Sequence, residues 1–210
     1  MSRVRVVTDT MIPARPTELS AVALTLARAF HDDPIFALLF GAIGTGHVPE
    51  LPSKRFFTIM AKVQLHHELV FRTPGDEAAA IWAPPGEWKL PNIQIAKHAL
   101  PLARTFGWRL FANLEILGRL ERDHPIEPHY YLEFIGTDPT HQGKGMATAL
   151  IEPMMERCDA EGVGAYLESS KESNVAFYGR FGFAVTKAIT HKPAKGRAGL
   201  EQWLMWRDPR

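Results

Sequence analysis

Residues 141–151, HQGKGMATALI, place a turn with two glycines directly before an amphipathic helix. The first amides of a helix have no partner inside the helix, so a helix N-terminus attracts anions. Gly143 and Gly145 let those amides approach phosphate oxygens, and Lys144 adds a positive charge beside them. This stretch therefore predicts a phosphate-binding turn built from residues 142–147.

The residues after the turn predict the helix itself. Its apolar stripe consists of Ala147, Leu150, Ile151, Met154, Met155 and Cys158, at helical spacing. Pro153 lacks the N–H for an intrahelical hydrogen bond, which predicts a kink at that position. Gly162 and Gly164 end the segment, so we expect one helix packed against a sheet.

The segment before the turn, residues 129–137, alternates its side chains as a strand does. The face expected to be buried carries Tyr130, Leu132 and Phe134. The opposite face carries two titratable groups, His129 and Glu133, roughly 13 Å apart in an extended strand. Both groups are therefore placed to reach a substrate cleft.

Outside this region the hydropathy pattern predicts an α/β (α+β) fold in a single domain over residues 1–210. Helices are predicted at 17–30, with Thr17 as N-cap, at 54–68, at 173–178, and between 91 and 124, where Pro101 breaks the helix. Strands are predicted at 3–8, 70–73, 78–83, 165–167, 183–187 and 200–206, with an antiparallel hairpin over 69–83. Asp33 before Pro34 fits ordinary turn chemistry, and a carboxylate facing a cationic substrate is the alternative.

The composition fits a soluble, cytoplasmic globular protein. Lys and Arg (24) nearly balance Asp and Glu (23), which argues against nucleic acid and anionic membranes as partners. No uncharged stretch approaches the ~18 residues of a membrane span, and no signal sequence is predicted. The single cysteine, Cys158, excludes an internal disulfide and is typical of a reducing compartment.

Two other phosphate-binding motifs fit the turn poorly. A P-loop needs Lys followed by Ser or Thr, but Lys144 is followed by Gly145. A dinucleotide-binding fingerprint needs Gly or Ala where Thr148 stands, and it belongs near the start of a parallel βαβ unit. A P-loop is therefore excluded, and a nucleotide-binding oxidoreductase is disfavoured.

The pattern Gln142-x-x-Gly145-x-Ala147 is followed by a second block that contains Asn174 and Tyr178. Together the two blocks resemble the acetyl-CoA motif of the GCN5-related N-acetyltransferase (GNAT) superfamily. Within it, HYYLEFIGTDPTHQGKG, AYLESS and NVAFYGRFGF are similar to the branch that contains puromycin N-acetyltransferase. The resemblance implies an acetyl-CoA-binding core over about residues 129–188.

The resemblance also implies a fold and a set of cofactor contacts. The fold is a mixed, mostly antiparallel central sheet of about seven strands flanked by helices, with a splay between the fourth and fifth strands. The residues expected to bind acetyl-CoA are Ile135, Gly136 and Thr137 beside the pantetheine arm, Gln142, Gly143, Lys144, Gly145, Met146 and Ala147 beside the pyrophosphate, and Asn174. For Asn174, a helix N-cap is the equal alternative.

Acetyl transfer to an amine needs a base that takes a proton from the ammonium and an acid that returns one to the departing thiolate. The resemblance implies Tyr178 as the acid, with a simple packing aromatic as the alternative. No motif fixes the base. His129 and Glu133 are equal candidates for the base, and Glu168 is a third candidate or a counter-ion for the amine.

The predicted function is acetyl-CoA-dependent N-acetylation of a primary amine of a small molecule, by direct transfer through a ternary complex. Protein lysine or N-terminal acetylation and a non-catalytic acyl-CoA-binding or regulatory module are the alternatives. We expect no metal, because the histidines are scattered and His66-His67 lacks a matched ligand cluster. The sequence leaves a homodimer open.

Overall fold

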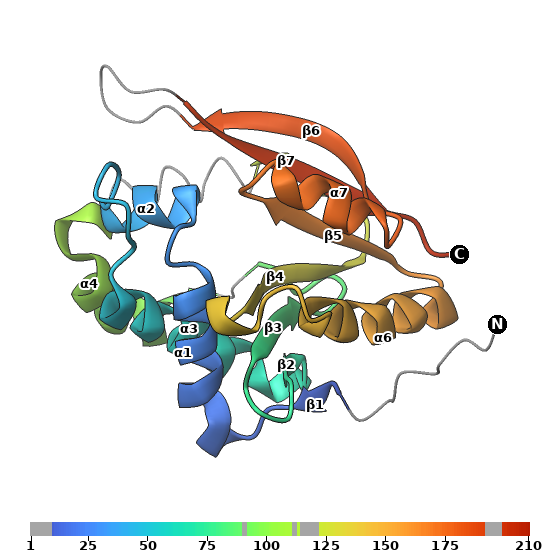
Figure 1. The fold of residues 1–210 in the computed structure, drawn as a ribbon, viewed down its shortest axis with the longest axis horizontal. Helices are drawn as coiled ribbons and strands as arrows, with labels where there is room; N and C mark the ends of the chain where they lie inside the picture. The colour runs from blue at the N-terminus through green and yellow to red at the C-terminus, as the bar shows by residue number, and fades with distance from the viewer. Residues whose placement is uncertain (1–9, 90–91, 111–112, 114–121, 192–198) are drawn as a thin grey trace.

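The computed structural model describes residues 10–89, 92–110, 113, 122–191 and 199–210, and its strands form one seven-stranded sheet (Figure 1). The strands are β1 Ile12–Pro13, β2 Val70–Arg72, β3 Ala78–Ala83, β4 His129–Thr137, β5 Gly164–Ser169, β6 Ala184–His191 and β7 Leu200–Arg207. Their order is β1-β2-β3-β4-β5-β7-β6, and β4 and β5 form the parallel pair between otherwise antiparallel neighbours. The predicted mixed, mostly antiparallel sheet and its β2–β3 hairpin are therefore confirmed.

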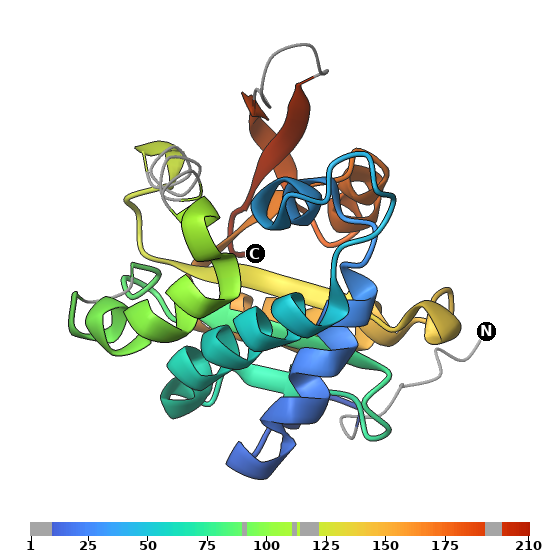
Figure 2. The same cartoon turned by 90° about the vertical axis from the view of Figure 1, so that its left-hand side faces the viewer.

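Helices cover both faces of this sheet. The α-helices are α1 Leu19–Ala29, α2 Pro34–Phe40, α3 Glu50–Gln64, α4 Asn92–Phe106, α6 Met146–Glu161 and α7 Ser173–Gly179, and the 3₁₀ turns are η1 Pro16–Glu18, η2 Leu65–His67, η3 Gly107–Arg109 and η4 Pro139–His141. Figure 2 shows α1, α3 and α4 in front of one face, and Figure 1 shows α6 on the opposite side. Among the described helices, none combines the length and the apolar character that crossing a membrane requires.

Two hydrophobic cores lie on the two faces of β3, which explains why that strand is buried along its whole length. On one face Ala80 and Trp82 pack with the predicted stripe of α6, which is buried from Leu150 to Cys158. On the other face Ala79 and Ile81 pack with α1, α2 and α3. Helix α6 continues through Pro153 as a single helix, since burial of its stripe outweighs the one hydrogen bond that proline cannot form.

Strand β4 contains a register shift that the alternation did not predict. Ile81 of β3 pairs with Phe134, but the next residue, Trp82, pairs with Leu132, so Glu133 is the extra residue of a bulge. Beyond the bulge each side chain changes face. Phe134 therefore packs toward α1 and α3 rather than sharing a face with Tyr130 and Leu132, and that part of the prediction is wrong.

The N-terminal helices differ from the prediction at their starts. Thr17 lies inside η1 and does not cap a helix; α1 begins at Leu19, and the Glu18 carboxylate instead accepts a hydrogen bond from the Arg15 amide. The apolar residues after Asp33 form α2, because Asp33 caps the helix and Pro34 occupies its first position, where proline needs no N–H donor.

Two other helix predictions need correction. Helix α3 begins at Glu50 rather than at 54, and α4 runs through Pro101 without a break. The last strands are longer than predicted, at 184–191 and 200–207, and they pair as expected. The predicted strand at 3–8 lies outside the described residues.

Candidate active site

The predicted anion turn lies between β4 and α6 and is shaped by two left-handed glycines. Gly143 has φ of 76°, and Gly145, the N-cap of α6, has φ of 82°. No described atom lies within 4 Å of a Cβ built at either position, so the backbone conformation, rather than crowding, requires glycine. Among the described residues no side chain caps the start of α6 at Gly145, which leaves the first amides of α6 for a ligand.

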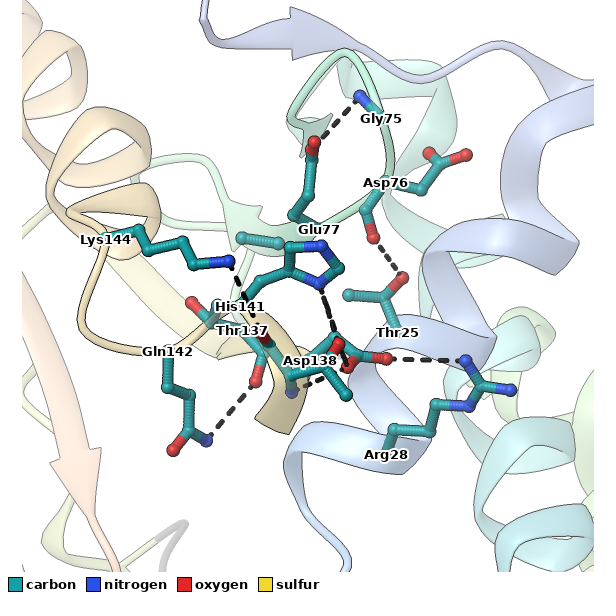
Figure 3. A network of polar contacts seen from close by, with 12 residues as sticks. Thr25, Arg28, Gly75, Asp76, Glu77, Thr137, Asp138, His141, Gln142 and Lys144 are labelled. Carbon is teal, nitrogen blue, oxygen red and sulfur yellow. Dashed lines mark hydrogen bonds and ion pairs between the residues drawn. The ribbon is translucent and has the colours of Figure 1, made fainter.

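The side chains around this turn make polar contacts that hold it against β4 (Figure 3). The Gln142 amide nitrogen donates to the Thr137 carbonyl at 3.4 Å, and the Lys144 ammonium donates to the Thr140 carbonyl at 3.4 Å. Asp138 caps η4 by accepting hydrogen bonds from the Thr140 hydroxyl and amide, and the hydroxyl contributes most to lowering the pKa of this carboxyl. The turn is thus fixed by its own neighbours while its amides stay open.

Strand β4 leaves β5 before either strand ends. Their pairing stops at Leu132 and Leu167, whereas β4 continues to Thr137 and β5 continues to Ser169. This is the predicted splay between the fourth and fifth strands. On its other edge β4 stays paired with β3 through residues 135–137, so the backbone facing β5 is left for a ligand.

Gly136 has a packing role that the sequence did not reveal. A Cβ at this position would collide with Ala29 of α1, so glycine allows α1 to pack directly on β4. Its neighbour Ile135 lines the cavity described next. The close packing of α1 fixes the strand segment that was predicted to face the pantetheine arm.

A cavity of about 650 Å³ opens where β4 and β5 diverge. Its floor consists of Tyr131, Leu132, Glu133, Phe134, Ile135 and the segment 167–171. Its walls consist of Ala29, Phe30, Asp33, Ile35, Phe36, Leu39, Phe56, Met60, Trp88, Lys89, Leu102, Phe106, Leu110, Asn113, His124, Asn174, Tyr178 and Gln202. Four predicted site residues, Ile135, Glu133, Asn174 and Tyr178, therefore meet in one cavity, while residues 142–147 and His129 lie outside its lining.

Tyr178 is buried on α7, with its ring against Phe177 and Phe183, and it lines the cavity. Burial, with a smaller contribution from the nearby Asp33 carboxylate, raises the pKa of its hydroxyl well above the ordinary value. The side chain is therefore a proton donor that keeps its proton at physiological pH. The ring packs as one alternative predicted, the residue also lines the cavity, and its role as the acid stays a prediction.

Asn174 lies inside α7, and the N-cap of that helix is Glu172. The alternative prediction, that Asn174 caps the helix, is therefore wrong. Its position in the cavity lining leaves its amide for a ligand.

Glu133, the bulge residue, lines the cavity and is nearly enclosed. Its Oε1 accepts a hydrogen bond of 2.7 Å from the Gln64 amide, and its Oε2 is buried with no partner among the described residues. Burial raises the pKa of this carboxyl to about 8, against the effect of the Gln64 hydrogen bond, and the Glu168 charge adds to the rise. A carboxyl in this state is matched to proton exchange near neutral pH.

His129, the other predicted base, is 1% exposed and lies behind the cavity wall. Its Nε2 is 3.0 Å from the Nε2 of His124, a residue that does line the cavity. Sequence reasoning missed His124 because it precedes the strand and belongs to no motif. Burial lowers the pKa of His129, which keeps its imidazole neutral.

Glu168 also lines the cavity and is fixed from behind by two tyrosines. The hydroxyl groups of Tyr131 and Tyr166 donate to its two carboxylate oxygens at 2.9 and 3.1 Å. Its charge interacts with that of Glu133, so the two carboxylates share one region of the cavity.

Two aspartates at the start of α2 join this helix to the segment after β5. Asp33 is buried, caps α2, lines the cavity and accepts a hydrogen bond from Ser170. Asp32 forms a 2.7 Å ion pair with Lys171. Asp33 thus has the predicted turn role and also contacts the cavity, which a sequence position alone did not indicate.

The His66-His67 pair has a neighbour that the sequence did not connect with it. Ligand atoms of His66, His67 and Glu87 lie within 4.8 Å of one another, with His66 and Glu87 exposed. These residues are outside the cavity lining. The expectation that no metal takes part stays a prediction.

Comparisons with known proteins agree with this geometry. A family model, the acetyltransferase (GNAT) family, matches residues 82–183, which span β4, the glycine turn, α6, β5 and α7. An uncharacterized N-acetyltransferase of Schizosaccharomyces pombe is 29% identical over 203 residues, covering 89% of this chain and 78% of the relative.

Solved structures share the whole architecture. A Corynebacterium glutamicum protein, described as histone acetyltransferase HPA2 and related acetyltransferase, is 22% identical with a TM-score of 0.68, covering 96% of each chain. Arylalkylamine N-acetyltransferase 2 of Aedes aegypti is 14% identical with a TM-score of 0.65, covering 95% of this chain and 98% of its own. The family match and the relative place residues 82–183 in the acetyltransferase (GNAT) family, whose co-substrate is acetyl-CoA, and the solved structures show that the fold is shared.

Proposed function

We propose that this protein transfers the acetyl group of acetyl-CoA to the primary amine of a small molecule, by direct attack in a ternary complex. The observation that carries the proposal is one cavity lined by both a buried hydroxyl, Tyr178, and a buried carboxyl with a free oxygen, Glu133. These are the acid and the base that amide formation needs. The volume of about 650 Å³ suits a small ligand.

The backbone around the splay supports binding of acetyl-CoA. Residues 135–137 have no β5 partner and would bond the pantetheine arm, while an amide near Ile135 would polarise the thioester carbonyl. The amides of residues 142–147 would bind the pyrophosphate at the start of α6, with Lys144 nearby. Asn174 would add a contact from the cavity wall.

Tyr178 and Glu133 then divide the proton transfers. Glu133 takes one proton from the acceptor ammonium, and the neutral amine forms the new C–N bond at the thioester carbon. The C–S bond breaks, and Tyr178 gives its proton to the leaving thiolate. The second amine proton leaves as the amide forms and restores Tyr178. His129 has no direct access to this cavity, which favours Glu133 between the two predicted bases.

The walls of the cavity favour a small acceptor with an apolar body. Phe36, Phe56 and Phe106 line the cavity, with ring centroids 5.6 Å apart for Phe36–Phe56 and 5.7 Å apart for Phe56–Phe106. Aromatic side chains offer contact area to an apolar ligand body. The similarity to an arylalkylamine N-acetyltransferase points to the same class.

A protein acceptor is the second candidate, because another structural neighbour is described as a histone acetyltransferase. The apolar part of the lining argues against it, since a lysine side chain arriving with its peptide would meet five phenylalanine and five leucine residues in this cavity. A non-catalytic acyl-CoA-binding module is disfavoured, because both proton-transfer groups line the cavity.

The test is a screen for release of free thiol from acetyl-CoA. Arylalkylamines, polyamines, amino sugars, a lysine-containing peptide and a peptide with a free N-terminus are supplied in turn, with acceptor-free enzyme as the control. We expect the largest rates with arylalkylamines. Rates confined to the peptides would assign a protein substrate, and coenzyme A binding without thiol release from any acceptor would assign a binding module.

A further inference from the structure

A line of buried polar side chains runs behind the cavity and ends at Glu168. It starts at the Glu127 carbonyl, which lies 2.6 Å from Nδ1 of His129. Nε2 of His129 lies 3.0 Å from Nε2 of His124, and Nδ1 of His124 lies 3.8 Å from Oε1 of Glu168. The proposed acid and base use none of these contacts, so the line calls for a separate explanation.

The carbonyl at the start of the line determines where the protons lie. A carbonyl only accepts, so Nδ1 of His129 carries its proton and Nε2 of the neutral ring has the lone pair. Nε2 of His124 must then carry a proton in order to donate to His129. When the His124 ring is neutral, its lone pair is on Nδ1, the atom that faces Glu168.

This arrangement places two acceptors side by side at the cavity wall. His124 and Glu168 both line the cavity, and Glu168 accepts hydrogen bonds from Tyr131, which also lines the cavity, and from Tyr166, which does not. Trp88 stacks on His124 with ring centroids 3.7 Å apart, which fixes the plane of the imidazole. A ligand that carries several N–H donors and a positive charge would satisfy both acceptors at once.

We propose that Glu168 and Nδ1 of His124 together bind the ammonium group of the acceptor amine. This inference rests on the proposed function and extends it, because it gives the amine a binding subsite distinct from the base. One N–H bonds the carboxylate, a second bonds the imidazole, and the third is left for Glu133, which shares this region of the cavity. His129 is a positioning residue, since it sets the tautomer of His124 without lining the cavity.

The subsite selects primary amines. Three N–H groups are needed to satisfy Glu168, His124 and Glu133 together, and only a primary ammonium has three. A secondary amine would lose one contact, and a tertiary amine would lose two. The apolar body of the acceptor would then contact Phe56 and Phe106, which line the same cavity.

Binding of 2-phenylethylamine to the complex of the protein with coenzyme A tests the subsite without any turnover. Calorimetry at pH 7 compares this amine with 2-phenylethanol, which has the same body and no charge. We expect Glu168→Gln to weaken amine binding by about 10- to 100-fold and to leave binding of the alcohol unchanged. The matched control is Glu201→Gln, at an exposed glutamate outside the cavity lining, which should change amine affinity little.

Two variants of His129 provide the second test of the subsite. His129→Leu removes the acceptor for His124, so His124 turns its proton toward Glu168, and amine affinity should fall by about tenfold. His129→Gln keeps an acceptor there and should retain the affinity. Wild-type protein that binds the amine no better than the alcohol, or Glu168→Gln that keeps wild-type amine affinity, would overturn the subsite. The proposed function would survive either result, since thiol release tests it separately.

Discussion

The two halves of the proposed site, one for acetyl-CoA and one for the acceptor amine, are built in different ways. The donor half, residues 135–137 and 142–147, is nearly contiguous in sequence and offers mainly backbone groups. The acceptor half takes side chains from α2, α3, α4, the segment before β4 and β5. A backbone-built half should tolerate changes of side chain but not changes of backbone conformation. A half built from side chains should depend on individual groups.

Tyr178 lies where the two halves meet, and its substitution should give the largest loss of activity. Phenylalanine keeps the ring contacts with Phe177 and Phe183 but cannot donate a proton to the thiolate. We expect Tyr178→Phe to lower kcat by about 10²- to 10³-fold while acetyl-CoA affinity stays near wild type. Steady-state kinetics with the best amine of the screen, together with coenzyme A calorimetry, measure both quantities. Unchanged turnover would show that the hydroxyl is not the acid.

Substitution of Glu133 should give the second-largest loss of activity, and it should also change how activity depends on pH. A base acts when ionised, and burial raises the pKa of Glu133 to about 8, so kcat/KM should rise with pH through about 8 and level off above it. Glu133→Gln should lower kcat by about 100-fold and remove this rise. A wild-type pH profile in the variant would assign the base to another group.

The same carboxyl affects stability in a direction that can be checked independently. Its pKa is raised from 4.5 to about 8 on folding, so between these values the unfolded chain releases a proton that the folded chain keeps. Folding stability from this group is therefore present at low pH and is lost as pH rises through that window. Glu133→Gln lacks this loss, so its Tm relative to wild type should increase between pH 5 and pH 9.

The sequence predicted the local structure of the proposed donor half well because its determinants are local, whereas its contacts with acetyl-CoA stay a prediction. Left-handed glycines, an uncapped helix start and a strand before them occupy one short segment, and Asn174 and Tyr178 belong to a second recognisable block. The bulge at Glu133 was not predictable, because a one-residue insertion against β3 leaves the hydropathy pattern of β4 unchanged.

The residues of the acceptor half were mostly not predicted from the sequence, because they come together only in the folded chain. Helices at residues 34–40 and 50–64 owe their positions to packing against β3 and β4, and no motif records which of their faces borders a cavity. His124 gains its place through contacts with His129 and Glu168, which lie in two different strands. Such a site depends on tertiary distances, whereas the glycine turn depends on φ and ψ of adjacent residues.

Gly145 tests whether the donor half depends on backbone conformation. Valine there cannot adopt φ of 82° without strain, so Gly145→Val should turn the first amides of α6 away and weaken coenzyme A binding by about tenfold or more. The matched control is Gly162→Val at the other end of α6, where φ is 66° and a Cβ is equally unobstructed. Both variants should lose about 1–2 kcal/mol of stability, and only the first should lose coenzyme A affinity by calorimetry. Equal affinities would remove the anion-binding role of the turn.

Substitution of Lys144 should give the smallest effect on coenzyme A binding. It therefore tests whether side chains or the backbone of the turn bind the anion. The Lys144 side chain is exposed and donates to the Thr140 carbonyl at 3.4 Å, so solvent and salt screen its charge from a bound pyrophosphate. We expect Lys144→Ala to weaken coenzyme A binding by only about two- to threefold at physiological salt, and to flatten the salt dependence of the dissociation constant. Calorimetry at two salt concentrations measures both effects. A loss as large as that of Gly145→Val would mean that a side chain, rather than the backbone of the turn, provides most of the anion binding, and the contrast between the two halves would no longer hold.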